Sequence, residues 1–87
     1  MEIEFDPHKE AQNQKKHGIG FAEAATCLLD PRALVQEDDD AEDEQRFVLL
    51  GMSSSARLLV VVYTLRGEAI RLISARKPTR KEEESYA

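Results

Sequence analysis

The segment that decides the fold is Arg57-Leu-Leu-Val-Val-Val-Tyr-Thr64, a nearly continuous run of apolar and β-branched side chains. A run of this length without polar alternation is typical of a strand that is covered on both faces. We therefore predict that residues 57–64 form the central strand of a sheet. The serines at 53–55 and the pair Arg66-Gly67 predict turns on either side of it.

Further strands are predicted on both sides of this segment. Arg46–Met52 is a strong candidate, Ala33–Gln36 is a shorter one, and Ala69–Ala75 alternates between apolar and polar side chains. The connections after Arg46 are short, so these strands are predicted to form an antiparallel meander. Met1–Phe5 also alternates, which predicts a short strand with one face in water.

Two helices are predicted near the amino terminus. Asp6-Pro7 supplies an N-cap and a first helical position, and Gly18 after His17 suits a helix terminator. A second helix is predicted from about Gly20 to Leu29, with apolar side chains at positions i, i+3, i+4 and i+7, and Asp30-Pro31 ends it.

A short, highly charged helix is predicted to open at Pro78-Thr79 and to run to Tyr86. The predicted fold class is therefore α+β. Two amino-terminal helices pack on a four- to five-stranded, mainly antiparallel sheet, and a short carboxyl-terminal helix follows. With 87 residues, the chain is expected to form a single domain, residues 1–87.

Composition excludes several function classes. No apolar run approaches the roughly 20 residues that span a bilayer, so we expect a cytoplasmic protein without membrane contact. The single cysteine, Cys27, excludes an internal disulfide and favours a buried thiol. His8 and His17 do not share a helix face, and Gly-rich phosphate loops and zinc-protease motifs are absent. No metal or cofactor is therefore expected.

The charge is unevenly distributed along the chain. The net charge is −5, but residues 37–44 hold seven acidic residues and no basic one. Residues 66–81 hold six basic residues against the single acid Glu68. Because the local field decides which ligand is steered to a surface, the basic half remains compatible with a polyanionic ligand.

The remaining polar side chains suit phosphodiester chemistry on RNA without a metal. RNA carries its own nucleophile, the 2′-hydroxyl, so the protein needs only to align it, move protons and neutralise the phosphate. Arginine and lysine match phosphate oxygens, and His17 could act as an acid or a base. Structural roles compete with this interpretation, because Glu44 and Arg46 suit a surface ion pair and Tyr63 suits a core position.

The roles of three further residues stay open. Arg71 and Arg76 lie five residues apart, which puts them on opposite faces of a strand unless the strand ends or bulges between them. Tyr86 lies near the carboxyl terminus, where its ring could simply fasten the last helix.

The sequence resembles the BrnT family of type II toxin–antitoxin ribonucleases. The matching stretches are Phe5-Asp6-Pro7 with Lys16-His17-Gly18, Asp30-Pro-Arg-Ala33, Glu44-x-Arg46-Phe47, Val61-Val-Tyr-Thr64, Arg71-Leu-Ile-Ser-Ala-Arg-Lys77, and Thr79-Arg80 with Glu82 and Tyr86. The resemblance implies a fold like that of RelE toxins, an RNA-cleaving toxin that blocks translation, and a BrnA-like ribbon-helix-helix antitoxin that carries any operator DNA contacts.

The resemblance also implies a set of site residues. The implied catalytic positions are His17, Glu44, Arg46, Tyr63, Arg71 and Arg76, and the implied RNA-binding positions are Lys16, Lys77, Arg80 and Tyr86. A metal-independent endoribonuclease is the leading hypothesis. The alternative is a non-catalytic module that binds an antitoxin and tunes repression of the operon. Direct DNA binding is disfavoured, because the sequence shows no recognition helix.

Overall fold

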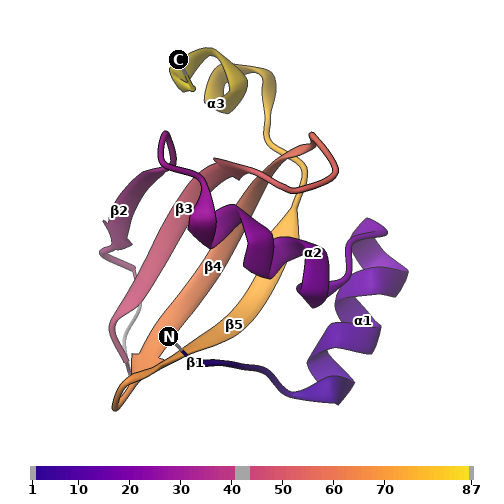
Figure 1. Ribbon diagram of the computed structural model, residues 1–87, viewed down its shortest axis with the longest axis vertical. Helices are drawn as coiled ribbons and strands as arrows, with labels where there is room; N and C mark the ends of the chain where they lie inside the picture. The colour runs from indigo at the N-terminus through magenta and orange to yellow at the C-terminus, as the bar shows by residue number, and fades with distance from the viewer. Residues whose placement is uncertain (1, 41–43, 87) are drawn as a thin grey trace.

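The computed structural model describes residues 2–40 and 44–86, and five strands and three α-helices are assigned in them. Figure 1 shows one twisted sheet, with the carboxyl-terminal helix lying beyond its end. The elements are β1 (Glu2–Glu4), α1 (Pro7–His17), α2 (Phe21–Thr26), a 3₁₀ turn η1 (Cys27–Leu29), β2 (Leu34–Asp38), β3 (Arg46–Met52), β4 (Leu58–Arg66), β5 (Ala69–Arg76) and α3 (Arg80–Ser85).

The sheet has the strand order β1-β5-β4-β3-β2, so β4 is central as its apolar run predicts. Strands β2 to β5 are antiparallel to their neighbours, whereas β1 pairs in parallel with β5. The sheet is therefore mixed but mainly antiparallel, and the predicted α+β class is confirmed.

The core lies between the sheet and α2 with the residues that flank it. Phe21 and Ile19 are fully buried against Leu59, Val61 and Leu72 from the two middle strands. Figure 1 shows α2 crossing this face of the sheet. This side of the sheet is the helix face, and the opposite side is the open face.

The predicted helix Gly20–Leu29 is confirmed as helical, but its last three residues form a 3₁₀ turn. It is α-helical only over α2 and tightens into η1, where the Asp30 N–H bonds the Cys27 carbonyl. This carbonyl lies tightly against β3, since a Cβ on Gly51 would come within 3.1 Å of it. The missing Gly51 side chain therefore lets η1 approach the sheet closely.

The other boundaries shift by a few residues. Strand β2 starts at Leu34 and extends to Asp38, because its register with β3 continues to the pair Asp38–Arg46. Strand β4 likewise continues past residue 64 to Arg66. The last helix starts later than predicted, because Thr79 is its N-cap.

A β-bulge in β5 resolves the placement of Arg71 and Arg76. Val62 of β4 lies opposite Ser74, but the next residue, Tyr63, lies opposite Leu72. Ile73 is therefore an extra residue, which shifts the alternation of side chains by one. As a result Arg71 and Arg76 share the open face of the sheet.

The two edges of the sheet differ. On one edge, β1 covers only Ala69–Arg71 of β5, and α1 packs beside the rest. On the other edge, β2 pairs with β3 alone among the described strands. None of the helices in residues 2–40 and 44–86 is long and apolar enough to cross a membrane.

Candidate functional site

Helix α1 presents a basic stripe to the neighbouring strand β5. Lys9, Gln12, Lys16 and His17 follow the spacing i, i+3, i+7 and i+8, which places them on one side of the helix. The helix ends after His17 because Gly18 adopts the left-handed conformation with φ of 71°. Basic side chains in the last turn are favourably placed against the helix dipole.

The carboxyl-terminal ends of α1 and β5 meet around a hollow of about 520 Å³. It is lined by Lys16 and His17 from α1 and by Arg76, Lys77 and Thr79 from the end of β5 and the residues after it. A second hollow of about 260 Å³ continues along α1 and shares Lys16 and His17. It adds the following polar lining residues: Lys9, Gln12, Asn13 and Ser74.

The two hollows together are called the basic groove. None of the described residues that line it is acidic. Four ammonium or guanidinium groups line the groove with one imidazole, although the protein as a whole carries a net charge of −5. A groove with this local charge attracts polyanions.

Arg76 is held rigidly at the rim of the groove. Its Nη1 and Nη2 atoms donate to the two Glu82 carboxylate oxygens at 2.8 and 2.9 Å, and Nη1 also donates to the Lys77 carbonyl. The Arg76 hydrogen bonds and those from Thr79 lower the pKa of Glu82 to about 2. The Arg76 charge is thus fixed in place and partly offset by Glu82.

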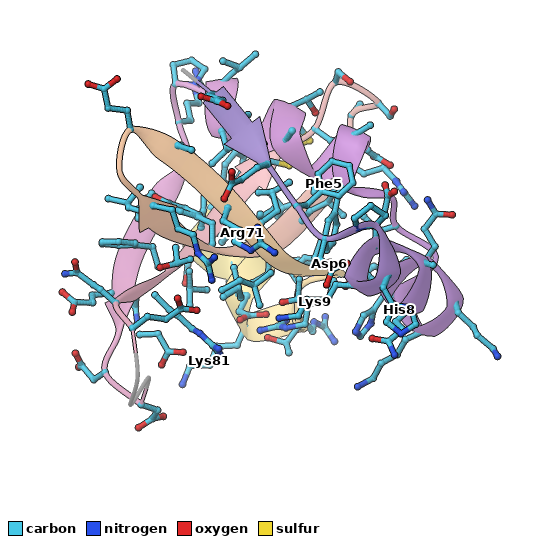
Figure 2. All side chains as sticks on the ribbon, turned by 90° about the horizontal axis from the view of Figure 1, so that it is seen from below. Phe5, Asp6, His8, Lys9, Arg71 and Lys81 are labelled. Carbon is cyan, nitrogen blue, oxygen red and sulfur yellow. The ribbon has the colours of Figure 1, made fainter. Side chains whose placement is uncertain are left out.

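Arg46 and Arg71 lie elsewhere, in one row across the open face. The residues directly opposite one another in this row, from β2 to β1, are Asp38, Arg46, Thr64, Arg71 and Glu4. Arg71 lies beside β1 and its Nη1 is 3.3 Å from the Glu4 carboxylate (Figure 2).

Arg46 lies near Glu44, as the sequence predicts for a surface ion pair. The Arg46 Nε and Glu44 Oε1 atoms are 3.8 Å apart, and the other Glu44 oxygen is 3.9 Å from Arg66. Within the described residues the buried Arg46 Nε has no hydrogen-bond partner. Neither Glu44 nor Arg46 is among the residues that line the basic groove.

The two tyrosines have structural surroundings. Tyr63 lies on the helix face and stacks on Phe47 with ring centroids 5.4 Å apart, and burial raises its pKa. The Tyr86 hydroxyl donates to Asp30 Oδ2 at 2.5 Å, which raises the pKa of Tyr86 and lowers that of Asp30. Neither tyrosine lines the basic groove, and nor does the exposed Arg80 at the start of α3.

The structure thus brings four of the ten predicted site residues together: Lys16, His17, Arg76 and Lys77. Sequence reasoning missed Lys9 and Gln12, although their spacing from Lys16 shows that they share its helix face. It also missed Ser74, because the bulge at Ile73 decides which way the end of β5 faces. The assembled groups can bind phosphates and transfer a proton through His17.

Comparison with known proteins supports one family. Residues 5–82 match the family model described as "Ribonuclease toxin, BrnT, of type II toxin-antitoxin system". The fold is similar to the crystal structure of the Brucella abortus ribonuclease toxin BrnT, with a TM-score of 0.71 and 26% sequence identity over 92% of this chain and 99% of that chain. No curated protein sequence matches the chain significantly.

Proposed function

Since the chain belongs to the BrnT family of ribonuclease toxins of type II toxin–antitoxin systems, we propose that it is a metal-independent endoribonuclease whose site is the basic groove. The proposed reaction is attack of an RNA 2′-hydroxyl on the adjacent phosphorus. The bond to the 5′-oxygen of the next nucleotide breaks, and the products are a 2′,3′-cyclic phosphate and a 5′-hydroxyl end.

The observation that carries the proposal is the placement of His17 among cations. Its imidazole lines the same 520 Å³ hollow as Lys16 and Lys77, so a phosphate bound there would lie beside a side chain that can accept or donate a proton. His17 is proposed to take the proton of the 2′-hydroxyl or to supply one to the leaving oxygen. Lys16, Lys77 and the fixed Arg76 are proposed to stabilise the charge on the phosphate as it becomes pentacoordinate.

The remaining predicted positions receive supporting roles in this proposal. Arg71 shares the open face with Arg76, so Arg71 and Arg46 are proposed to contact RNA beyond the cleaved bond. Arg80 is exposed and is proposed to add to the positive potential. Tyr63 and Tyr86 are proposed to stabilise the fold through Phe47 and Asp30. Glu44 is proposed to position Arg46.

Membership of a type II system implies an antitoxin partner. We propose that this antitoxin is a BrnA-like ribbon-helix-helix protein, that it supplies the contacts to operator DNA, and that the toxin acts on RNA in the cytoplasm. A likeness of the fold to RelE toxins belongs to the same proposal. It is supported by the mixed five-stranded sheet with α2 packed on one face.

The test is an RNA-cleavage assay in the presence of a chelator. His17→Ala is expected to lower the cleavage rate by about 100-fold or more. His8→Ala is the matched control, because His8 is an exposed histidine on the same helix and does not line the groove. It should cleave like the unmodified protein.

Two outcomes would contradict the proposal. Equal cleavage by His17→Ala and His8→Ala would remove the imidazole from the mechanism. Intact RNA in the presence of a stoichiometric amount of antitoxin-free protein would instead favour the non-catalytic module that binds an antitoxin and tunes repression.

A further inference from the structure

Among the described strands β2 forms an edge, called the free edge, whose side chains divide into an apolar and an acidic half. Leu34 and Val35 are 46% and 50% exposed, which is unusual for large apolar residues at a sheet edge. Glu37 and Asp38 follow in the same strand, and Asp39 and Asp40 continue the negative charge into the next turn.

The opposite side of the sheet offers a much shorter edge, because its edge strand β1 spans only Glu2–Glu4. There β1 pairs with the first part of β5, and the Asn13 side chain bonds the backbone of Ala75 further along. Among the described strands, β2 pairs only with β3. The unpaired backbone groups of an edge strand are a template for another strand.

A hollow of about 210 Å³ lies beside this edge. Its apolar lining comes from Leu34 and Val35 of β2, from Val48 and Leu50 of β3, and from Val60 of β4. A side chain from a strand added to β2 can therefore be buried against Leu34 and enter this hollow. Backbone pairing and apolar burial would then act together.

We propose that the free edge of β2 binds an extended segment of the antitoxin, with apolar side chains beside Leu34 and Val35 and basic side chains beside Glu37 and Asp38. Charge complementarity carries the choice of a basic segment. That the toxin has an antitoxin follows from its family, but this surface is separate from the basic groove and does not depend on RNA cleavage.

A second copy of the chain is the less suitable occupant. Antiparallel self-pairing centred on Gln36 would place Leu34 opposite Asp38 and Val35 opposite Glu37. Parallel self-pairing would instead align the acidic residues with one another. Both arrangements place acids against apolar groups or against like charges, which disfavours pairing.

A labelled peptide tests the surface directly. The probe is Lys-Arg-Arg-Lys-Thr-Val-Ile, whose basic and apolar halves match β2 in antiparallel order, and a scrambled peptide of the same composition controls for charge alone. Fluorescence anisotropy should show binding of the matched peptide to the full-length protein. In hydrogen exchange, residues 34–38 should gain protection when that peptide binds.

Two charge-reversal variants make the test specific. Glu37→Lys with Asp39→Lys is expected to weaken binding of the matched peptide by about fivefold or more. Glu2→Lys with Glu68→Lys makes the same change of charge at exposed positions away from β2, and it should change binding less than twofold. RNA cleavage should be unchanged in both, so failure of this surface is distinguishable from failure of the proposed nuclease.

The same segment should be protected when the toxin is co-expressed and purified with its antitoxin. Absence of peptide binding would overturn the proposal, as would equal binding of the scrambled peptide or equal binding by the two variants. Protection confined to β1 or the basic groove would also overturn it. Stable dimers of the free protein with β2 protected would assign the edge to a second copy.

Discussion

The side-chain amide of Asn13 pairs with the backbone of Ala75 as a neighbouring strand would. Asn13 Nδ2 donates to the Ala75 carbonyl at 2.9 Å, and the Ala75 N–H donates to Asn13 Oδ1 at 3.1 Å. Asn13 Nδ2 also donates to the Ile19 carbonyl at 2.9 Å. One buried side chain thereby holds α1, the turn after it and the end of β5 together, which fixes the two walls of the basic groove.

Asn13→Ala is expected to destabilise the protein by about 3 kcal/mol. The substitution leaves the buried N–H and carbonyl of Ala75 and the carbonyl of Ile19 without their partner, and unsatisfied buried groups are costly. Urea unfolding measures the change. Gln12→Ala is the matched control, since Gln12 is its exposed neighbour on α1 and should change stability by less than about 0.5 kcal/mol.

Asn13→Asp distinguishes hydrogen bonding from packing. A carboxylate keeps the shape of the side chain but would face the Ala75 and Ile19 carbonyls without a proton to donate. The variant should therefore regain stability as the pH is lowered and the carboxyl group becomes protonated. Equal stability of Asn13→Asp and the unmodified protein at pH 7 would contradict this role.

Acid should weaken the junction of α2 with the turn before β4. The Glu23 carboxylate accepts hydrogen bonds from Arg57 Nε at 2.9 Å and from the Ser53 hydroxyl at 2.7 Å. These bonds, led by those from Arg57, lower the pKa of Glu23 from 4.5 to about 2. A lowered folded-state pKa stabilises the protein above the unfolded value, and this stabilisation is lost as the pH falls from about 4.5 to about 2.

Replacing the Glu23 carboxyl group should make the stability of the protein less dependent on pH. Glu23→Gln is expected to lower the free energy of unfolding at pH 7 and to lose less stability than the unmodified protein between pH 5 and pH 3. Denaturant unfolding at several pH values measures both effects. Parallel curves of stability against pH for the two proteins would contradict the assignment to Glu23. Glu82 should add a similar pH dependence of stability through Arg76, because its pKa is also about 2.

Lys9 extends the basic groove and should contribute one phosphate contact. Lys9→Ala is expected to weaken binding of a non-cleavable 2′-O-methyl RNA about threefold to tenfold and to reduce the slope of log affinity against log salt by about 0.7. Lys15→Ala is the control, because Lys15 is exposed on the same helix but does not line either hollow. Equal salt slopes for the two variants would place the RNA elsewhere.

Tyr86 should matter for stability and not for RNA. Tyr86→Phe removes the hydroxyl that bonds Asp30 and is expected to cost about 1 kcal/mol in unfolding free energy. Its cleavage rate with subsaturating RNA should equal that of the unmodified protein. A lower rate with unchanged stability would support the RNA-binding role that the family resemblance implies.

Local signals explain why much of the fold was predictable. Asp6-Pro7 and Gly18 define α1 because a cap and a left-handed terminator act within a few residues. The apolar run of β4 specifies a central strand without further context. The signature of a capping box, Thr79 followed three residues later by Glu82, is also present and marks the start of α3 better than Pro78 does.

The site was only partly predictable because its geometry depends on contacts between distant segments. Nothing in the alternation of β5 identifies Ile73 as the extra residue of a bulge, yet the bulge decides that Arg71 and Arg76 share a face. In the sequence Asn13 is one of many polar residues in an exposed helix, and only its contact with β5 distinguishes it. The pairing of Tyr86 with Asp30 joins residues 56 positions apart.

The most direct test of the central claim is the chemistry of the cleaved RNA ends. An oligonucleotide is incubated with antitoxin-free protein and a chelator, and the products are analysed by mass spectrometry. The expected products carry a 2′,3′-cyclic phosphate and a 5′-hydroxyl, and a single 2′-deoxy substitution at the cleaved position should abolish cutting there. Products with a 5′-phosphate, or undiminished cutting at the deoxy position, would contradict cleavage by the 2′-hydroxyl in the basic groove.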